Sequence, residues 1–292
     1  MHYSSNIAEV PAPAKINLCL IVGPRRGDGF HPVCSLMEKI MLFDTLRTIP
    51  EAEGTGIRLT GSDIPAAENI VMRAARALER EIGRRLDVDI ELRKEIPAAA
   101  GLGGGSSDAA AILKLLNFHF ELRVPPGKLA EIGLSLGADV PFFLSPGPQL
   151  AQGIGEALTP VPGMPDYALV LVKPSVSLST AAVYESFDGQ NAAPGVFEDR
   201  CAALRSKLAK LAGLETLTDL MENDLETAAA ALFPDLQDVK KAIIETGAKA
   251  ALMSGSGSSV FGIFPDIEAA NAAARVLMRS YPLVWAAQPL RA

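Results

Sequence analysis

The chain has 292 residues, of which 49% are hydrophobic and 21% are charged, and its formal net charge is −7. This is the composition of a globular protein with a large core, built as two domains or as one large α/β domain. A net negative chain lacks the positive surface that non-specific nucleic-acid binding needs, although a local basic cleft for a phosphorylated ligand is compatible with it.

The three cysteines, Cys19, Cys34 and Cys201, are widely spaced and form no CxxC or Cys/His cluster. This pattern argues against structural zinc and predicts a reducing compartment, and Cys19 and Cys34 are expected to be buried structural thiols. The N-terminus lacks the pattern of a secretory signal, and no apolar run approaches the roughly 18 residues that span a bilayer. We therefore expect a soluble cytoplasmic protein without membrane or nucleic-acid partners.

The first half of the chain predicts strands and helices in alternation. Residues 14–22 have the pattern of a strand and are followed by the turn-rich stretch "GPRRGDG". Residues 35–49 form an extended segment of ambiguous period, and residues 56–60 form a short strand. Residues 69–83 predict a helix with apolar residues on one face and arginines on the other, and residues 87–96 alternate like a half-buried strand.

A glycine loop follows, and a helix is predicted from Ser106 or Ser107 to about Asn117. Residues 125–137 predict a helix that begins with proline and ends at glycine. Residues 167–172 have the pattern of a buried strand. Three prolines before that strand mark the expected boundary between domains 1–163 and 164–292: Pro160, Pro162 and Pro165.

The second half continues the alternation, so the fold class is α+β or α/β. Helices are predicted near residues 200–212, 236–246 and 267–279. Strands are predicted at residues 250–254, at 260–264 and near Leu283, with a second glycine loop at 254–259 and a surface loop at 188–195.

The stretch "AAAGLGGGSSDAA" contains four glycines followed by Ser106 and Ser107. A strand, a glycine-rich turn and a helix N-terminus together form an anion site, because close backbone N–H groups and the helix dipole both favour negative charge. The serines either cap the helix or donate hydroxyls to phosphate and metal-bound oxygens. A Walker A loop is excluded because the loop has no lysine, and a dinucleotide fingerprint is excluded because position 106 is serine. The alternative is a flexible helix cap.

The segment "PAAAGLGGGSSDAA" resembles the phosphate loop of the GHMP kinase superfamily. Its first and third motifs resemble "PAPAKINLCL" and "MSGSGSSVFGIF", in the same order along the chain. The resemblance implies an α+β fold of two domains, an N-terminal ribosomal-S5-like ATP-binding domain and a C-terminal ferredoxin-like domain, with a cleft between them. It also implies ATP as co-substrate. ATP chemistry implies Mg²⁺, but no carboxylate cluster in the sequence identifies the metal ligands.

The resemblance assigns the ATP site to a glycine-loop group and an adenosine group. Asn69 also has the pattern of a helix N-cap, and Asp108 is expected to complement the helix dipole without a catalytic role. The glycine-loop group comprises Gly101, Leu102, Gly103, Gly104, Gly105, Ser106 and Ser107, and the adenosine group comprises Asn69, Lys94 and Pro97.

Asp139, in "GADVPFF", is the candidate general base, since it follows a glycine-terminated helix and precedes an apolar stretch. The alternative is a helix-capping aspartate in a turn. Lys15 lies within an apolar strand and must reach a partner or a cleft, because an unpaired buried ammonium is costly. The resemblance implies that Lys15 pairs with Asp139 and stabilises charge on the substrate hydroxyl.

Within the superfamily, the segments "PAKINL", "RRGDGFH" and "LGADVPFF" resemble kinases of the non-mevalonate isoprenoid pathway. The implied substrate is a cytidyl diphosphate sugar alcohol, phosphorylated on its 2-hydroxyl. His31 and Phe30 would hold the pyrimidine by hydrogen bonds and stacking, with Phe30 where the family usually has tyrosine. The alternative for His31 is a packed or solvent-facing residue of a turn. Asn17, on the strand face of Lys15, and Thr180 would contact the substrate, and Gly255, Ser256 and Gly257 would close that side.

Two rival functions remain at the level of the sequence. One is another small-molecule kinase of the superfamily, acting on homoserine or mevalonate, which "GDGFH" disfavours because those substrates have no pyrimidine. The other is a nucleotide-binding sensor without catalysis, which the presence of both Lys15 and Asp139 disfavours. We expect a monomer or a weak homodimer.

Overall fold

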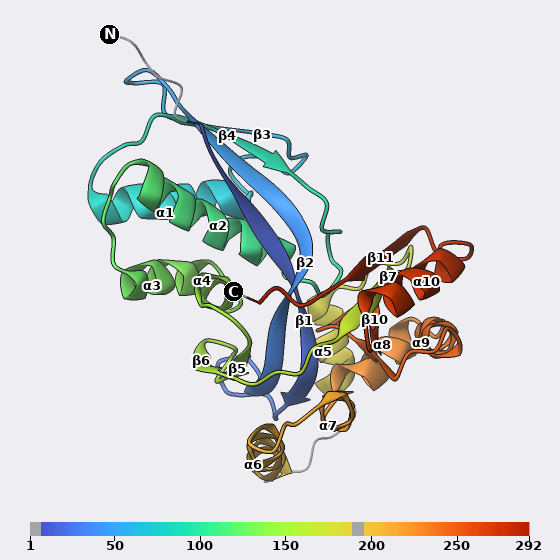
Figure 1. The fold of residues 1–292 in the computed structure, drawn as a ribbon. Coiled ribbons are helices and arrows are strands. Elements are labelled where there is room, and N and C mark those ends of the chain that lie inside the picture. The colour runs from blue at the N-terminus through green and yellow to red at the C-terminus, as the bar shows by residue number, and fades with distance from the viewer. Residues whose placement is uncertain (1–6, 189–195, 292) are drawn as a thin grey trace. The chain divides into compact units, whose positions relative to one another are not determined.

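The structure is a computed structural model that describes residues 7–188 and 196–291 (Figure 1). The chain divides by its contacts into two compact units, each built from several segments. Unit 1 comprises Met1–Ala14, Leu42–Ala98 and Gly103–Pro146, and unit 2 comprises Lys15–Met41, Ala99–Leu102 and Gly147–Ala292. Two long strands, β1 (Ala8–Val22) and β2 (Val33–Pro50), contribute residues to both units.

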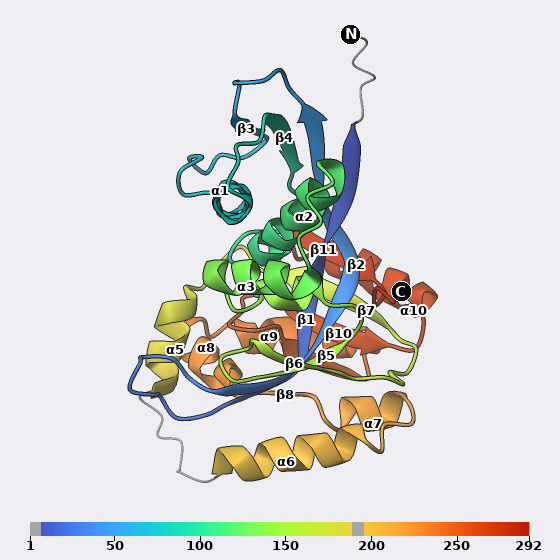
Figure 2. The ribbon, with the colours of Figure 1, turned by 90° about the vertical axis from the view of Figure 1, so that its left-hand side faces the viewer.

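In unit 1, strands support a group of packed helices (Figures 1 and 2). Strand β4 pairs antiparallel with the second half of β2, from Thr45 opposite Arg93 to Pro50 opposite Val88, and β3 pairs parallel with β4. Helix α2 packs against α1, α3 and α4. The elements are β3 (Ile57–Thr60), α1 (Ile70–Ile82), β4 (Val88–Arg93), α2 (Gly104–His119), α3 (Pro126–Leu136) and α4 (Val140–Leu144).

Helix α1 has clear signals at both ends. The Asn69 side chain accepts a hydrogen bond from the Val71 N–H at 2.8 Å, and Gly83 ends the helix with a left-handed φ of 67°. Its apolar face is buried, including Val71, Ala74 and Leu78. The predicted helix over residues 69–83 is therefore confirmed.

Helix α2 begins at Gly104, two residues before the predicted start at Ser106 or Ser107. Gly103 occupies the N-cap position with a left-handed φ of 69°, and its carbonyl accepts the Ser107 N–H at 2.9 Å. Because a residue without Cβ adopts this conformation readily, the chain enters the helix earlier than the serines suggest. Both serines lie in the first turn of the helix.

Unit 2 contains a four-stranded antiparallel sheet in the order β11-β7-β10-β9. Helices α9 and α10 pack against this sheet and α8 packs against α5, burying a core that includes Val170, Val172 and Phe264. The first half of β2 pairs with β5, which pairs with β6, and β1 pairs parallel with β8. The strands are β5 (Gln149–Gln152), β6 (Ala157–Pro160), β7 (Ala168–Lys173), β8 (Glu222–Asn223), β9 (Ala250–Met253), β10 (Val260–Phe264) and β11 (Leu283–Ala287).

The helices of unit 2 differ in part from the prediction. They are α5 (Thr180–Asp188), α6 (Val196–Leu208), α7 (Leu214–Thr218), α8 (Leu225–Leu232), α9 (Leu236–Glu245) and α10 (Ile267–Leu277). Helices α9 and α10 match the predicted segments, and α6 begins and ends four residues before the predicted 200–212. Of the predicted surface loop 188–195, Asp188 ends α5 and residues 189–195 lie outside the described residues. Among the helices of the described ranges, none combines the length and hydropathy that crossing a membrane requires.

Candidate active site

Two different constraints require glycine in the glycine loop: close packing at Gly101 and a left-handed backbone at Gly103. Gly101 has a φ of 74°, and a Cβ at this position would lie 2.0 Å from the carbonyl oxygen of Ser254 in the second glycine loop. Gly103 has the left-handed φ that starts α2. At Gly105, in contrast, an added Cβ would meet nothing closer than a methyl group of Ile70 at 3.6 Å. Gly101 is therefore required by packing, whereas a Cβ at Gly105 would make only an ordinary van der Waals contact.

The N-terminus of α2 carries the features of an anion site. Gly103, at the N-cap, has no side chain that could accept a capping hydrogen bond, so the first N–H groups of the helix lack the usual side-chain cap. The Ser107 hydroxyl is buried and, among the described residues, has no hydrogen-bond partner. Ser106 Oγ lies beside Gly137, because a Cβ added to that glycine would lie 3.9 Å from the serine oxygen. Uncapped N–H groups and an unsatisfied buried hydroxyl are suited to a phosphate chain.

Lys94 forms a charge cluster with two buried carboxylates at the start of α2. Its ammonium donates to Asp44 and, at 2.7 Å, to Asp108, while the other Asp44 oxygen accepts the N–H groups of Glu95 and Ile96. Burial raises the pKa of Asp108 to about 7, although the adjacent Lys94 opposes the shift. The predicted role of Asp108 as a simple dipole complement is incomplete, because this carboxyl also pairs with Lys94.

The predicted adenosine residues lie near the same helix. Asn69 is buried and its amide is fully engaged, since Oδ1 accepts from Val71 and Nδ2 donates to Ser62 Oγ at 2.9 Å. Its N-cap role is therefore confirmed. Pro97 is partly exposed next to Ile96, whose side chain would lie 3.0 Å from a Cβ at Gly104.

Asp139 lies between α3 and α4. Gly137 ends α3, and Asp139 occupies the N-cap position of α4 with a right-handed backbone and no side-chain capping hydrogen bond. Asp139 thus stands at the cap position that the alternative reading gives it, but its side chain makes no capping hydrogen bond to α4. The side chain is partly buried, and α4 begins with the fully buried Val140 immediately after it.

In unit 2, Lys15 and Asn17 lie on one face of β1, as the period of the strand predicts. Lys15 Nζ donates to Asn17 Oδ1 at 2.5 Å, and Asn17 Nδ2 donates to Ser35 Oγ at 2.8 Å. Gly255 of the second glycine loop closes over this pair, since a Cβ there would lie 3.3 Å from Asn17 Oδ1. The strand thus presents a buried cation in a polar, hydrogen-bonded setting.

His31 is enclosed by groups that lie far from it in the sequence as well as by its own loop. Its Nδ1 lies 2.9 Å from the Gly23 carbonyl and its Nε2 lies 3.2 Å from Asp188. The ring lies 5.1 Å from that of Tyr184 and 5.9 Å from that of Phe187, both on α5. Phe30 is 57% exposed. Helix α5 therefore supplies aromatic partners that no local motif near His31 revealed.

The remaining predicted substrate residue, Thr180, begins α5. Its hydroxyl lies 2.8 Å from Ser256 Oγ of the second glycine loop. The three cysteines are free and buried, which confirms the prediction for Cys19 and Cys34. Among the described residues, no group of three or more His, Cys, Asp or Glu side chains could hold a metal ion.

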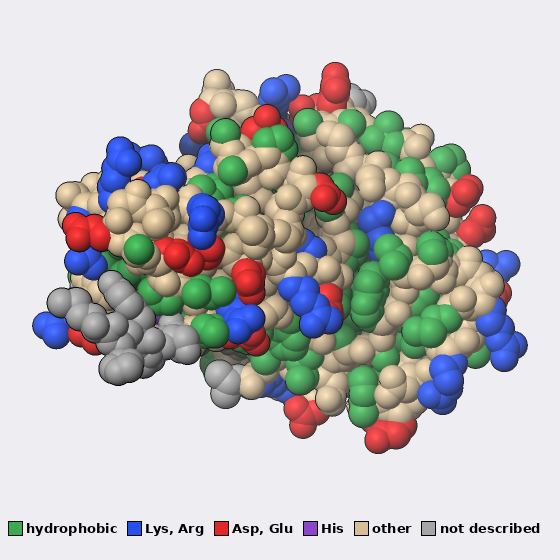
Figure 3. Space-filling model, turned by 90° about the horizontal axis from the view of Figure 1, so that it is seen from above, with side chains coloured by type: hydrophobic (Ala, Val, Ile, Leu, Met, Phe, Trp, Pro, Cys, Tyr) green, Lys and Arg blue, Asp and Glu red, His purple; other side chains and the backbone are tan. Residues whose placement is uncertain are grey.

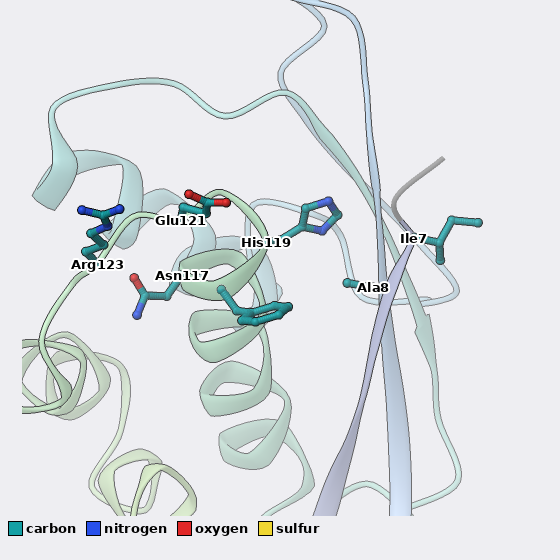
Figure 4. Close-up of a pocket in the computed structure, with 7 residues that line it drawn as sticks. Ile7, Ala8, Asn117, His119, Glu121 and Arg123 are labelled. Carbon is teal, nitrogen blue, oxygen red and sulfur yellow. The ribbon is translucent and has the colours of Figure 1, made fainter. Parts of the chain in front are cut away.

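A separate cavity of about 470 Å³ lies at the far end of α2 (Figure 4). It is lined by side chains from the end of this helix, by Glu121 and Arg123 beyond it, and by Ile7 and Ala8 at the start of β1. Helix α2 has 16 residues, and at about 1.5 Å per residue this cavity lies roughly 20 Å from the glycine loop. It is therefore not part of the phosphate site.

The fold is that of a GHMP kinase. The family models for the GHMP kinase N-terminal and C-terminal domains match residues 69–147 and 204–283. The chain is 41% identical to the 4-diphosphocytidyl-2-C-methyl-D-erythritol kinase of Syntrophotalea carbinolica, covering 96% of this chain and 98% of that protein. It is 40% identical to the kinase of the same name from Moorella thermoacetica, covering 95% and 97%.

Solved structures agree with these relatives. A crystal structure of 4-(cytidine 5'-diphospho)-2C-methyl-D-erythritol kinase superposes with a TM-score of 0.81 at 35% identity, over 97% of this chain and 99% of that one. A homoserine kinase from Cytophaga hutchinsonii gives 0.78 at 19% identity, over 100% and 98%, which shows the fold alone. The chain belongs to the GHMP kinases and, among them, to the 4-diphosphocytidyl-2-C-methyl-D-erythritol kinase family. The predicted α+β fold and family are confirmed.

Proposed function

We propose that the chain transfers the γ-phosphoryl group of ATP to the 2-hydroxyl of 4-diphosphocytidyl-2-C-methyl-D-erythritol, giving the 2-phosphate and ADP. The observation that carries the proposal is the anion site of α2, where uncapped N–H groups accompany a buried Ser107 hydroxyl without a partner. A kinase site works by positioning and charge neutralisation, which this arrangement supplies. The relatives that bear this substrate in their names direct the choice of acceptor.

Gly103–Ser107 would hold the triphosphate, with the remaining glycine-loop residues Gly101 and Leu102 shaping its entry. Asn69, Lys94 and Pro97 would border the adenosine. The Asn69 amide already has two protein partners, so its contribution there would be to fix the start of α1.

Mg²⁺ fits this site through the phosphates of ATP. The Ser107 hydroxyl is one group suited to contact the ion, since it is buried, unsatisfied and at the proposed phosphate-binding end of α2. When bound, the ion would neutralise charge on the phosphates.

Asp139 would take the proton of the attacking hydroxyl, and Lys15 would stabilise the oxygen that becomes negative. In support, Asp139 is partly buried beside the fully buried Val140, and Lys15 is held by Asn17 in a buried strand. Loss of a general base typically lowers a rate by about 10²–10⁴-fold.

The cytosine would be held beside His31. Phe30 offers an exposed face for stacking, and Phe187 and Tyr184 form an aromatic wall next to the imidazole. Asn17 and Thr180 would contact the methylerythritol portion. We expect the reaction in the cytoplasm, with a monomer or weak homodimer.

The test is ADP release by purified protein with ATP and Mg²⁺, comparing the cytidyl substrate with mevalonate and homoserine. Turnover on the cytidyl compound alone is expected. Asp139→Asn should lower kcat by about a hundredfold or more while leaving ATP affinity unchanged. Asp199→Asn, an exposed change on α6, serves as the control.

Two results would contradict the proposal. Turnover on mevalonate or homoserine would assign the chain to another kinase activity of the superfamily. ATP binding without turnover on any of the three substrates would favour a nucleotide-binding sensor and would make Asp139 a turn residue.

A further inference from the structure

Unit 1 contains a basic groove outside the residues assigned to catalysis. It lies between α1 and the end of α3 and encloses about 500 Å³. Its charged lining consists of Arg73, Arg76 and Arg80, and an adjoining hollow of about 390 Å³ continues along α1 past the last two of them. The remaining lining residues of the groove are Ala66, Ala67, Met72, Ser135 and Leu136.

The three arginines share a face because they are spaced by three and four residues on one helix. Over seven residues at about 1.5 Å each, they extend roughly 10 Å along the groove. An ordinary solvated helix face mixes charges of both signs. On the face drawn in Figure 3, acidic and basic side chains are indeed mixed with hydrophobic ones.

The groove departs from such mixing. No acidic side chain is among the residues that line the groove, although Glu79 lines the adjoining hollow. One Glu79 oxygen accepts from Arg76 at 2.7 Å and the other accepts the Leu86 N–H, so Arg76 is partly neutralised. Arg73 and Arg80 are exposed, and within the described ranges neither has a carboxylate within ion-pair distance. Two arginines thus face the groove with their donors uncommitted, in a chain whose net charge is −7.

The lining indicates the chemical class of the ligand. One guanidinium suffices for a single phosphate, which it binds through two parallel hydrogen bonds. Three guanidinium groups in a row match a chain of phosphates. The apolar side chains of Met72 and Leu136 offer a surface for an uncharged portion of the same molecule.

We propose that this groove is a second anion site, which binds a small molecule carrying two or more linked phosphates. The inference goes beyond the proposed kinase function and does not depend on it. The groove also adjoins the catalytic elements of unit 1, since Leu136 precedes Gly137 and the stretch from Ala66 precedes the Asn69 cap.

The test is calorimetric titration of the whole chain with inorganic tripolyphosphate, in buffer that contains Mg²⁺ and a saturating non-hydrolysable ATP analogue. Binding is expected to persist with the analogue present. The double variant Arg73→Gln/Arg80→Gln should weaken it about tenfold or more, because two charge-assisted contacts are lost. The double variant Arg275→Gln/Arg279→Gln, which removes two exposed arginines at the end of α10, should leave it unchanged.

The outcomes separate the alternatives. If the protein does not bind the analogue, the titration still reports on the groove, so failure of the proposed function is distinguishable from failure of this inference. The inference is overturned if the analogue abolishes tripolyphosphate binding, since the groove would then belong to the nucleotide site. Equal weakening in both double variants would also overturn it. So would tighter, arginine-dependent binding of a single-stranded RNA oligonucleotide, which would make the groove a nucleic-acid surface.

Discussion

Phe30 has 57% of its surface exposed, so it should contribute little to the stability of the fold. A role of Phe30 in substrate binding can therefore be measured separately. If its ring stacks on cytosine, Phe30→Ala should raise KM for the cytidyl substrate about tenfold, since stacking on one base contributes about 1–3 kcal/mol. Steady-state kinetics would measure this, with kcat and Tm unchanged. Phe118→Ala, at an even more exposed phenylalanine with 79% exposure, is the matched control. An unchanged KM in Phe30→Ala would remove Phe30 from the substrate site.

The two glycines at either end of the loop should respond differently to the same substitution. Gly101→Ala forces a Cβ against the Ser254 carbonyl at 2.0 Å with a positive φ, so we expect a loss of about 2 kcal/mol or more in unfolding free energy. Gly105→Ala meets only a methyl group at 3.6 Å and should fold normally. If the phosphates of ATP approach the backbone at Gly105, Gly105→Ala should raise Kd for ATP without lowering the free energy of unfolding. Urea unfolding and ATP titration distinguish the two effects, and equal destabilisation of both variants would contradict this assignment.

At the scale of elements, the charge cluster at the start of α2 predicts a pH dependence. The pKa of Asp108 is raised to about 7 by burial, from about 4 in an unfolded chain. Between these values the native carboxyl binds a proton that the unfolded chain has released, so its contribution to stability falls as pH rises from about 4 to 7. Asp108→Asn should flatten this part of the profile, since Lys94 keeps Asp44 as its partner. Urea unfolding at pH 5 and pH 8 checks it, with Asp199→Asn as a control that keeps the wild-type slope.

The elements that were predicted are those whose signals lie in their own sequence. Helix α1 has its Asn69 cap and α10 has Asp266, whose side chain accepts from Ala269, and both have an apolar face. Helix α8, in contrast, is an alanine-rich segment at whose N-cap Asp224 makes no capping bond, because that carboxylate binds Arg200. Strand β8 has two residues and exists only through its pairing with β1. Such elements are specified by tertiary contacts.

The candidate site likewise contains some residues that local sequence patterns predict and others that only tertiary contacts bring together. The glycine loop, Lys15 with Asn17, and Asp139 have local patterns, so their positions followed from the sequence and from the resemblance to a family. The ambiguous period of residues 35–49 also has a structural cause, since β2 is buried on both faces in its first half and alternates only afterwards. The aromatic neighbours of His31 and the packing of Ser254 on Gly101 join distant segments, and no local pattern encodes them.

At the scale of the whole chain, Arg291 ties the segment after β11 to β2. Its Nε donates to Glu38 at 3.3 Å, and its Nη1 donates to Asp166 at 2.7 Å and to the Met164 carbonyl at 3.0 Å. Glu38 is fully buried and also accepts the Tyr167 hydroxyl at 2.7 Å. The backbone adds to this closure, because Ile40 forms a bridge with Pro289.

Arg291→Met would leave the buried Glu38 carboxylate without its cation, so we expect a loss of about 2–3 kcal/mol in unfolding free energy at pH 8. Burial raises the pKa of Glu38, while Tyr167 and Arg291 oppose the rise. Without Arg291 the pKa of Glu38 would rise further. Because a carboxyl with a raised pKa destabilises the fold only where it is ionised, the loss of unfolding free energy should shrink as pH falls toward 5.

Adding Glu38→Gln to Arg291→Met should restore part of the stability, since no buried charge is then unpaired. Arg279→Met, at an exposed position, controls for loss of a surface charge. Unfolding in urea at pH 5 and pH 8 measures all four proteins, and a loss that does not change with pH would show that Arg291 acts through its carbonyl contacts instead.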